Sequence, residues 1–169
     1  MEVRLDYGLE AAVAEPTVTR KQLIERLNED LAREYQAIIA YVVYSQVLKG
    51  AQYMSIAKEL EKHASEELAH ALTVSKHIDY LGGIPTATPL AVPLSEDAET
   101  MLRADLDQEN NTIRAYRERV RQCEALGEYA VAEDIREILR QEQEHQNDLA
   151  TALGENAPDV SAPPRRKNR

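Results

Sequence analysis

The sequence contains no tryptophan and no phenylalanine, and Cys123 is the one cysteine among its 169 residues. A single cysteine excludes an intrachain disulfide framework and a paired-cysteine metal or redox site. The core therefore has to be built from Leu, Ile, Val and Ala, together with eight tyrosines whose hydroxyl groups need hydrogen-bond partners. Long apolar runs are also missing, which argues against a signal peptide or membrane span and predicts a cytoplasmic protein.

Positive charge is scarce, since the formal net charge is −10. An acidic surface disfavours nonspecific nucleic-acid binding and attracts cations. The final residues are the exception, because a short basic cluster ends the chain: Arg165, Arg166, Lys167 and Arg169.

Glycine and proline are concentrated at a few breaks, and the segments between them are rich in helix-favouring Leu, Ala, Glu, Arg and Gln. Thr19 with Gln22 fits a capping box, and Ser95 is the expected N-cap of the third helix. The predicted helices cover about 19–49, 52–81, 96–126 and 128–153. Residues 1–18 are expected to be an N-terminal extension, 19–153 the bundle, and 154–169 a flexible basic tail.

The connections between these helices are short, long and short. A short link makes its helices antiparallel, whereas a long crossover can carry the chain along the bundle and make the second and third helices parallel. The sequence thus predicts an all-α four-helix bundle with a long crossover between helices two and three and no fifth helix.

Four glutamates interrupt the apolar seams of these helices: Glu34, Glu67, Glu109 and Glu142. An ionised carboxylate in a core is costly unless it is paired or binds a metal. Two of them begin Glu-x-x-His motifs that end at His70 and His145, and this spacing places both side chains on one side of a helix. One such motif means little. Two motifs, two further glutamates and an equal offset within each helix pair predict a two-metal carboxylate site.

Other polar residues on the seams leave alternatives open. Tyr41 and Tyr116 follow Glu34 and Glu109 at the same offset. Each is either a catalytic accessory group, which hydrogen-bonds a ligand carboxylate or donates an electron, or an ordinary core tyrosine. Asp105 could orient a ligating imidazole. His63 and His77 are either metal-transit or accessory ligands, or ordinary polar or interface residues.

With these motifs the sequence resembles the bacterioferritin and Dps-like branch of the ferritin superfamily, over Thr19 to Leu153. The resemblance implies a ferritin-like bundle with a di-iron ferroxidase centre. Glu67 and Glu142 would bridge the metals, Glu34 and Glu109 would be terminal ligands, and His70 and His145 would supply nitrogen. Two iron ions per subunit are expected, manganese being the alternative, with Fe(II) oxidised by dioxygen or hydrogen peroxide and stored as ferric mineral in a hollow shell.

Departures from the family pattern refine these expectations. Leu68 stands where bacterioferritins carry their haem-ligating methionine, which argues against haem. The proline-containing end after Leu153 is poorly suited to a fifth helix, and together with the N-terminal extension it favours a homo-oligomeric dodecamer. Two alternatives remain open: a rubrerythrin-like or manganese-catalase-like enzyme that removes peroxide without storing mineral, and a Dps-like shell that protects DNA through its basic tail. Thr112 weakens the first, and the acidic body of the protein argues against the second.

Overall fold

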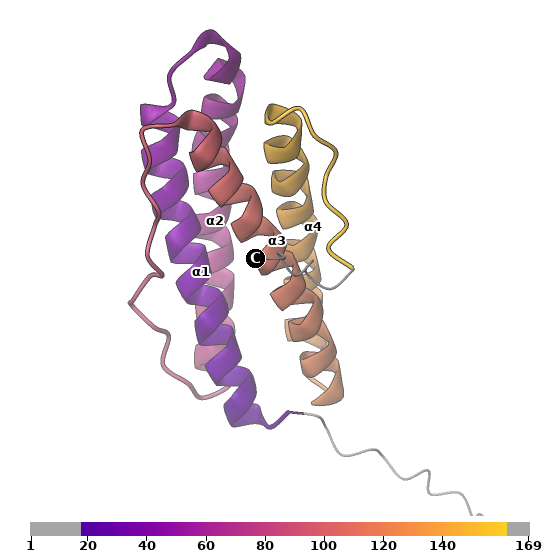
Figure 1. The fold of residues 1–169 in the computed structure, drawn as a ribbon. Helices are drawn as coiled ribbons and strands as arrows, with labels where there is room; N and C mark the ends of the chain where they lie inside the picture. Colours follow the sequence, from indigo (N-terminus) through magenta and orange to yellow (C-terminus); the bar gives the residue numbers. More distant parts are fainter. Residues whose placement is uncertain (1–17, 162–169) are drawn as a thin grey trace, which may run out of the picture.

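A computed structural model of the chain describes residues 18–161, which fold into four long helices (Figure 1). These are α1 (Arg20–Val47), α2 (Met54–Tyr80), α3 (Ala98–Ala125) and α4 (Tyr129–Ala152), and a 3-10 turn, η1 (Ala51–Tyr53), precedes α2. Within the described residues there is no strand. The predicted all-α four-helix bundle is therefore confirmed.

The long connection between α2 and α3 sets the topology. It runs back along α1 from one end of the bundle to the other, so α2 and α3 run parallel (Figure 1). The pairs α1–α2 and α3–α4 are antiparallel, and α1 also packs on α3 while α2 packs on α4. All four helices consequently contribute to one central core.

Side chains of α1 hold this crossover in place. Asn28 uses both ends of its amide, since Nδ2 donates to Ile84 O at 3.2 Å and Oδ1 accepts from Thr86 N at 2.6 Å. Further along, the buried Tyr44 hydroxyl donates to Pro93 O. These bonds satisfy backbone groups that an irregular segment cannot pair with itself.

The helix ends agree with the sequence in part. The Thr19–Gln22 capping box is present at the start of α1. Ser95 was the wrong N-cap for α3, because Asp97 caps this helix by accepting from Thr100 N at 2.7 Å. The Ser95 hydroxyl instead accepts from Asp97 N at 3.0 Å and so orders the turn before the cap.

The first helix is also shorter than predicted. It ends at Val47, because Leu48 leaves the helical region with φ −57° and ψ 126°. Gly50 follows with a positive φ of 120° and directly precedes η1.

The buried apolar residues form two clusters, one toward each end of the bundle. Leu23, Leu27, Leu31, Val74 and Ile135 belong to one cluster, with Cys123 among them. The other contains Tyr41, Tyr44, Leu60, Leu102 and Leu149. On every helix the seam glutamate lies between the residues of the two clusters, so the polar layer is enclosed by apolar packing on both sides.

A buried ion pair joins α1 to α3 within this frame. Arg119 Nε lies 2.6 Å from Asp30 Oδ2, and its Nη2 lies 3.2 Å from Asp30 Oδ1. Both side chains are almost fully buried. Such a two-point contact fixes the relative position of the helices and keeps neither charge unpaired.

After α4 the chain turns back along the bundle (Figure 1). Gln146 Nε2 donates to Pro158 O at 3.1 Å, and Val160 is buried. Most of the expected N-terminal extension, and the basic residues of the expected tail, lie outside the described residues. The division of the chain into extension, bundle and tail stays a prediction.

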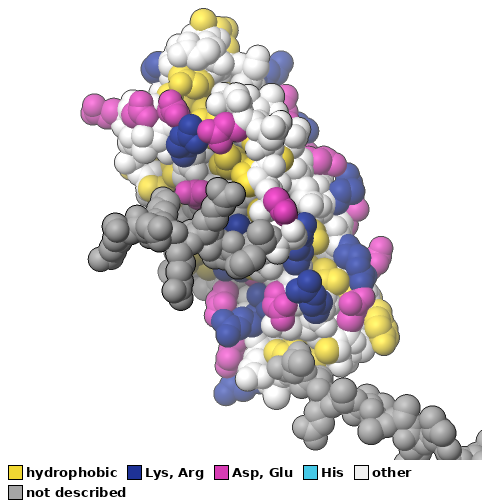
Figure 2. Space-filling model, turned by 45° about the vertical axis from the view of Figure 1, so that its right-hand side comes forward, with side chains coloured by type: hydrophobic (Ala, Val, Ile, Leu, Met, Phe, Trp, Pro, Cys, Tyr) yellow, Lys and Arg dark blue, Asp and Glu magenta, His cyan; other side chains and the backbone are white. Residues whose placement is uncertain are grey.

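Acidic and basic side chains lie interspersed on the face shown in Figure 2, with hydrophobic side chains between them. Many form ion pairs one turn apart on the same helix, as Arg140 does with Glu144 at 2.7 Å. In the part of the chain that the structure describes, no helix is long and apolar enough to cross a membrane.

Candidate metal centre

Six side chains converge between the two apolar clusters, and they are the six that the sequence predicted as metal ligands. Glu34 comes from α1, Glu109 from α3, and each Glu-x-x-His pair from α2 or α4. All six are at most 3% exposed: Glu34, Glu67, His70, Glu109, Glu142 and His145. The bundle thus buries four carboxylates and two imidazoles in one small volume.

The two helical motifs place their glutamates between the two histidines. His70 Nδ1 lies 2.9 Å from Glu67 Oε2 and 3.3 Å from Glu142 Oε1. His145 Nδ1 lies 2.9 Å from Glu67 Oε1 and 3.4 Å from Glu142 Oε2. Each of the two carboxylates therefore offers one oxygen to each side of the centre.

The remaining glutamates complete two overlapping sets of four candidate ligands. One set is Glu34, Glu67, His70 and Glu142; the other is Glu67, Glu109, Glu142 and His145. Within each set the ligand atoms lie within 4.8 Å of one another. Two metal positions that share two carboxylates are the arrangement expected of a bridged pair.

Unpaired polar atoms in the centre fit this reading. Several buried atoms lack a well-aligned hydrogen-bond partner, even where a charged neighbour lies close: Glu34 Oε2, Glu67 Oε1, Glu109 Oε2, His145 Nδ1 and both carboxylate oxygens of Glu142. Leaving so many acceptors unpaired would be costly in a purely structural core. Carboxylate and imidazole donors together suit iron, manganese or zinc, so the residues present fit a pair of such ions.

The outer glutamates gain protons more readily than usual. Burial, followed by repulsion from Glu142 and Glu67, raises the pKa of Glu34 well above its ordinary value. The pKa of Glu109 is raised well above normal by burial and then by the same two neighbours. Four close carboxylates cannot all be ionised without a compensating positive charge.

The two imidazoles respond in the opposite sense. Burial alone would lower the pKa of His145, but the nearby carboxylates of Glu142 and Glu67 outweigh it and raise that pKa to about 12. The pKa of His70 is raised as well, because burial is outweighed by its bonds to the surrounding glutamates. Protons on these groups supply positive charge to the cluster, and a divalent cation that binds there has to displace them.

Two residues that orient the imidazoles were not predicted. His70 Nε2 lies 2.7 Å from Gln141 Oε1, and His145 Nε2 lies 2.9 Å from Glu66 Oε2. Each partner comes from the opposite helix, and these contacts leave both Nδ1 atoms facing the centre. The signal in the sequence was position, since Glu66 and Gln141 each directly precede the glutamate of a Glu-x-x-His motif.

Asp105 does not have the orienting role considered for it. It is buried, but Oδ2 lacks a hydrogen-bond partner, and both histidine Nε2 atoms are bound by other side chains. Burial, then repulsion from Glu67, raises the pKa of Asp105 well above normal.

The two tyrosines cross the centre to the opposite glutamate. The Tyr41 hydroxyl of α1 donates to Glu109 Oε1 of α3, and the Tyr116 hydroxyl of α3 donates to Glu34 Oε1 of α1. Burial is the main cause that raises the pKa of both phenols, so each remains a neutral donor. Each tyrosine thereby fixes one oxygen of a glutamate and leaves the other oxygen free for a ligand.

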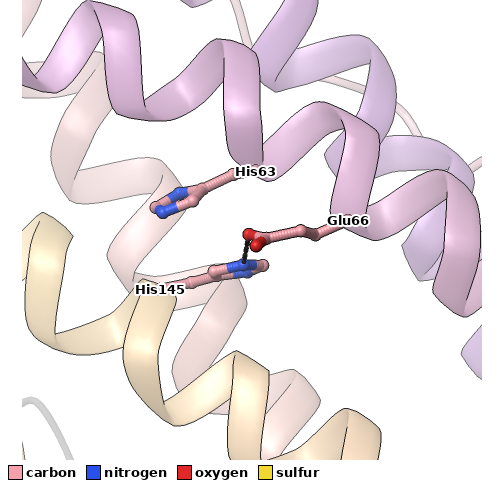
Figure 3. Close-up of side chains that lie close together, drawn as sticks. All are labelled: His63, Glu66 and His145. Carbon is pink, nitrogen blue, oxygen red and sulfur yellow. Dashed lines mark hydrogen bonds and ion pairs between the residues drawn. The ribbon is translucent and has the colours of Figure 1, made fainter.

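The two remaining histidines lie outside the six-residue centre. His77 Nε2 is 2.8 Å from Asp134 Oδ2, a contact between α2 and α4. His63 lies closer, with its ring stacked on His145 at a centroid distance of 4.0 Å (Figure 3). Burial, followed by repulsion from His145, lowers the pKa of His63 to about 4, so this imidazole is neutral.

A narrow pocket reaches the centre between α1 and α3. Its volume is about 10 Å³, and it is lined by Arg33, Glu34, Ala37, Glu67, Gln108, Glu109, Thr112 and Glu142. A space of this size holds about one water molecule. All four seam glutamates border it, so a small molecule in the pocket would lie against the candidate ligands.

Comparison with known proteins agrees with this geometry. Residues 24–157 match a protein family described as Ferritin-like domain. Bacterioferritin of Brucella melitensis is 30% identical over 135 residues, which cover 78% of this chain and 83% of that protein. Bacterioferritin of Desulfovibrio desulfuricans is also 30% identical, over 75% of this chain and 71% of the relative.

A solved structure extends the likeness to three dimensions. It is that of a ferritin-like, diiron-carboxylate protein from Bacillus anthracis, which is 35% identical to this chain. The two folds superpose with a TM-score of 0.76, covering 79% of this chain and 96% of the other.

Proposed function

The chain belongs to the family of ferritin-like domains, and on that premise we propose that it is a di-iron ferroxidase that stores iron. Fe(II) is its substrate, dioxygen or hydrogen peroxide is the oxidant, and the ferric product is kept as mineral inside a hollow homo-oligomeric shell. Iron storage is supported by the bacterioferritins among its relatives. We expect the shell to be a dodecamer. We also expect it to lack haem, because the side chain of Leu68 offers no donor atom to a haem iron.

One observation carries the proposal: Glu67 and Glu142 each present one oxygen to His70 and the other to His145. Carboxylates shared in this way can hold two ions side by side. Two Fe(II) ions bound there would together supply the two electrons that reduce one peroxide to water. A site for a single ion would not require two shared carboxylates.

Neighbouring side chains hold the candidate ligands in position for this reaction. Tyr41 and Tyr116 hold the outer glutamates by one oxygen each, while Gln141 and Glu66 hold the imidazoles by Nε2. The apolar clusters at both ends exclude bulk water, which strengthens the attraction between the carboxylates and a cation. The narrow pocket between α1 and α3 is the route we propose for the oxidant.

The test compares the wild type with the double variant Glu67→Gln/Glu142→Gln, which keeps side-chain size and removes both shared charges. Each protein is mixed with Fe(II) in air or with peroxide, and oxidation is followed by absorbance. Iron per chain and particle mass are then measured. We expect rapid oxidation and many irons per chain in the wild type, and loss of both in the variant.

Other results would contradict the proposal in distinguishable ways. Unchanged oxidation in the variant would mean that the seam glutamates do not hold the substrate. About two metals per chain with fast peroxide removal and no mineral would instead support the rubrerythrin-like or manganese-catalase-like reading.

A further inference from the structure

His63 is fully buried next to the six-residue centre, although it belongs to neither set of four ligands. It projects from α2 so that its ring lies over that of His145 from α4, with Glu66 beside them (Figure 3). Two further groups of three candidate ligands include it: His63 with Glu66 and His145, and His63 with Glu59 and Asp148. His63 thus links the centre to a second cluster.

The hydrogen bonding of His63 is incomplete. Its Nε2 lies 3.2 Å from Asp148 Oδ2, but its Nδ1 is buried without a hydrogen-bond partner. A buried imidazole with an unpaired nitrogen is less stable than an apolar side chain of similar size. The one hydrogen bond of His63 therefore joins it to a partly exposed carboxylate of α4.

Glu59 and Asp148 line the wall of a surface pocket between α2 and α4, with a volume of about 200 Å³. Both carboxylates are partly exposed, so hydrated cations can reach them. Their oxygens and a ring nitrogen of His63 lie within 4.8 Å of one another. One imidazole and two carboxylates, with remaining positions open to water, suit a divalent first-row transition-metal ion.

We propose that Glu59, His63 and Asp148 form a third divalent-cation site at the wall of this pocket. Its use as a station for Fe(II) on the way to the centre rests on the proposed function. The path is short, because the His63 ring stacks on His145, and Glu66 contacts His145 Nε2 at 2.9 Å. This route lies between α2 and α4, whereas the narrow pocket at the glutamates opens between α1 and α3.

The test for the site uses Zn²⁺, which does not change oxidation state. The full-length protein is crystallised with Zn²⁺, and the ions are located by anomalous scattering. Calorimetry gives the number of ions per chain. The test variant is Glu59→Gln/Asp148→Asn, which alters two partly exposed side chains. Asp134→Asn is the matched control, because Asp134 makes a similar contact with His77 between the same helices but belongs to no ligand group among the described residues.

We expect three ions per chain in the wild type and in the control, and two in the test variant, with the third ion between Glu59, His63 and Asp148. An empty position there in the wild type, or an ion that remains in the test variant, would overturn the proposal. Glu67→Gln/Glu142→Gln separates the two hypotheses. If the wild type and this variant both bind one ion and only at the third position, the proposed centre fails and the third site stands.

The transit role has its own measurement. Oxidation of Fe(II) should slow several-fold in Glu59→Gln/Asp148→Asn, both for the first two ions per chain and for those that follow. Rates equal to those of the wild type in both phases would refute the transit role.

Discussion

Binding of Zn²⁺ is expected to stabilise the folded chain strongly, and most of this effect should come from the shared carboxylates. The folded protein buries four glutamates, and at least one carboxylate oxygen of each lacks a hydrogen-bond partner: Glu34, Glu67, Glu109 and Glu142. A cation supplies the charge and the bonds that these atoms lack. The unfolded chain offers no such preformed cluster, so binding favours the folded state.

The size of the effect follows from the two overlapping ligand sets. One site occupied at 100 times its dissociation constant stabilises by about 2.7 kcal/mol, so two sites give about 5 kcal/mol. For a domain of 150–250 residues, about 1 kcal/mol shifts the melting temperature by roughly 2–4 °C. The centre should therefore raise the melting temperature by about 10–20 °C.

Scanning calorimetry at one fixed protein concentration, with and without Zn²⁺, measures this shift. The wild type is compared with Glu67→Gln/Glu142→Gln, and Asp134→Asn again serves as the control that keeps the full shift. The proposed third site adds its own smaller shift in all three proteins, so the prediction concerns the difference between them. Equal shifts in the wild type and the double variant would show that the shared glutamates do not bind the ions.

Three further predictions concern single side chains. Tyr116→Phe leaves Glu34 Oε1 without its hydrogen bond, so urea unfolding should show a loss of about 1–3 kcal/mol, while the exposed Tyr129→Phe should show none. Protonation of His145, whose pKa is raised from 6.5 to about 12, stabilises the fold fully below pH 6.5 and less at higher pH. The free energy of unfolding should therefore fall as pH rises from 6.5 toward 12, and Zn²⁺ affinity measured by calorimetry should increase over that range. Asp30→Ala leaves the Arg119 charge buried and unpaired, which should cost about 3–5 kcal/mol in urea unfolding; a loss below 1 kcal/mol would contradict that reading.

The sequence predicted the architecture well because the periodic signals were strong. Apolar residues at helical spacing defined four helices, and glycine and proline marked the breaks between them. The six residues of the centre were identifiable because glutamates on an apolar seam contradict the surrounding pattern. The cost of burying a carboxylate selected the four glutamates, and the Glu-x-x-His spacing selected the two histidines.

Residues whose role depends on the rotation of one helix against another were not predictable in this way. Glu66 and Gln141 lie one position before a ligand, where a helix pattern alone gives them no defined direction. Their contacts with the histidines exist because α2 and α4 pack closely enough for each side chain to cross between them. The Asp30–Arg119 pair was missed for the same reason, since its members lie on different helices.

The helix boundaries show a smaller limit of the same kind. Ser95 and Asp97 both have side chains suited to an N-cap, and the choice depends on where the crossover leaves α1. Tyr44 holds the crossover at Pro93 O, and four residues later the carboxylate of Asp97 accepts from Thr100 N.

The centre has two similar halves, which differ in the residue that contacts the histidine. In both halves a tyrosine holds the outer glutamate and a residue of the opposite helix holds the histidine. Behind His70 that residue is the neutral Gln141, whereas behind His145 it is the acidic Glu66. A carboxylate behind an imidazole makes it a stronger donor, so the two metal positions are chemically unequal. His63 and the pocket between α2 and α4 lie on the His145 side, so this asymmetry places the stronger nitrogen donor beside the proposed path for iron.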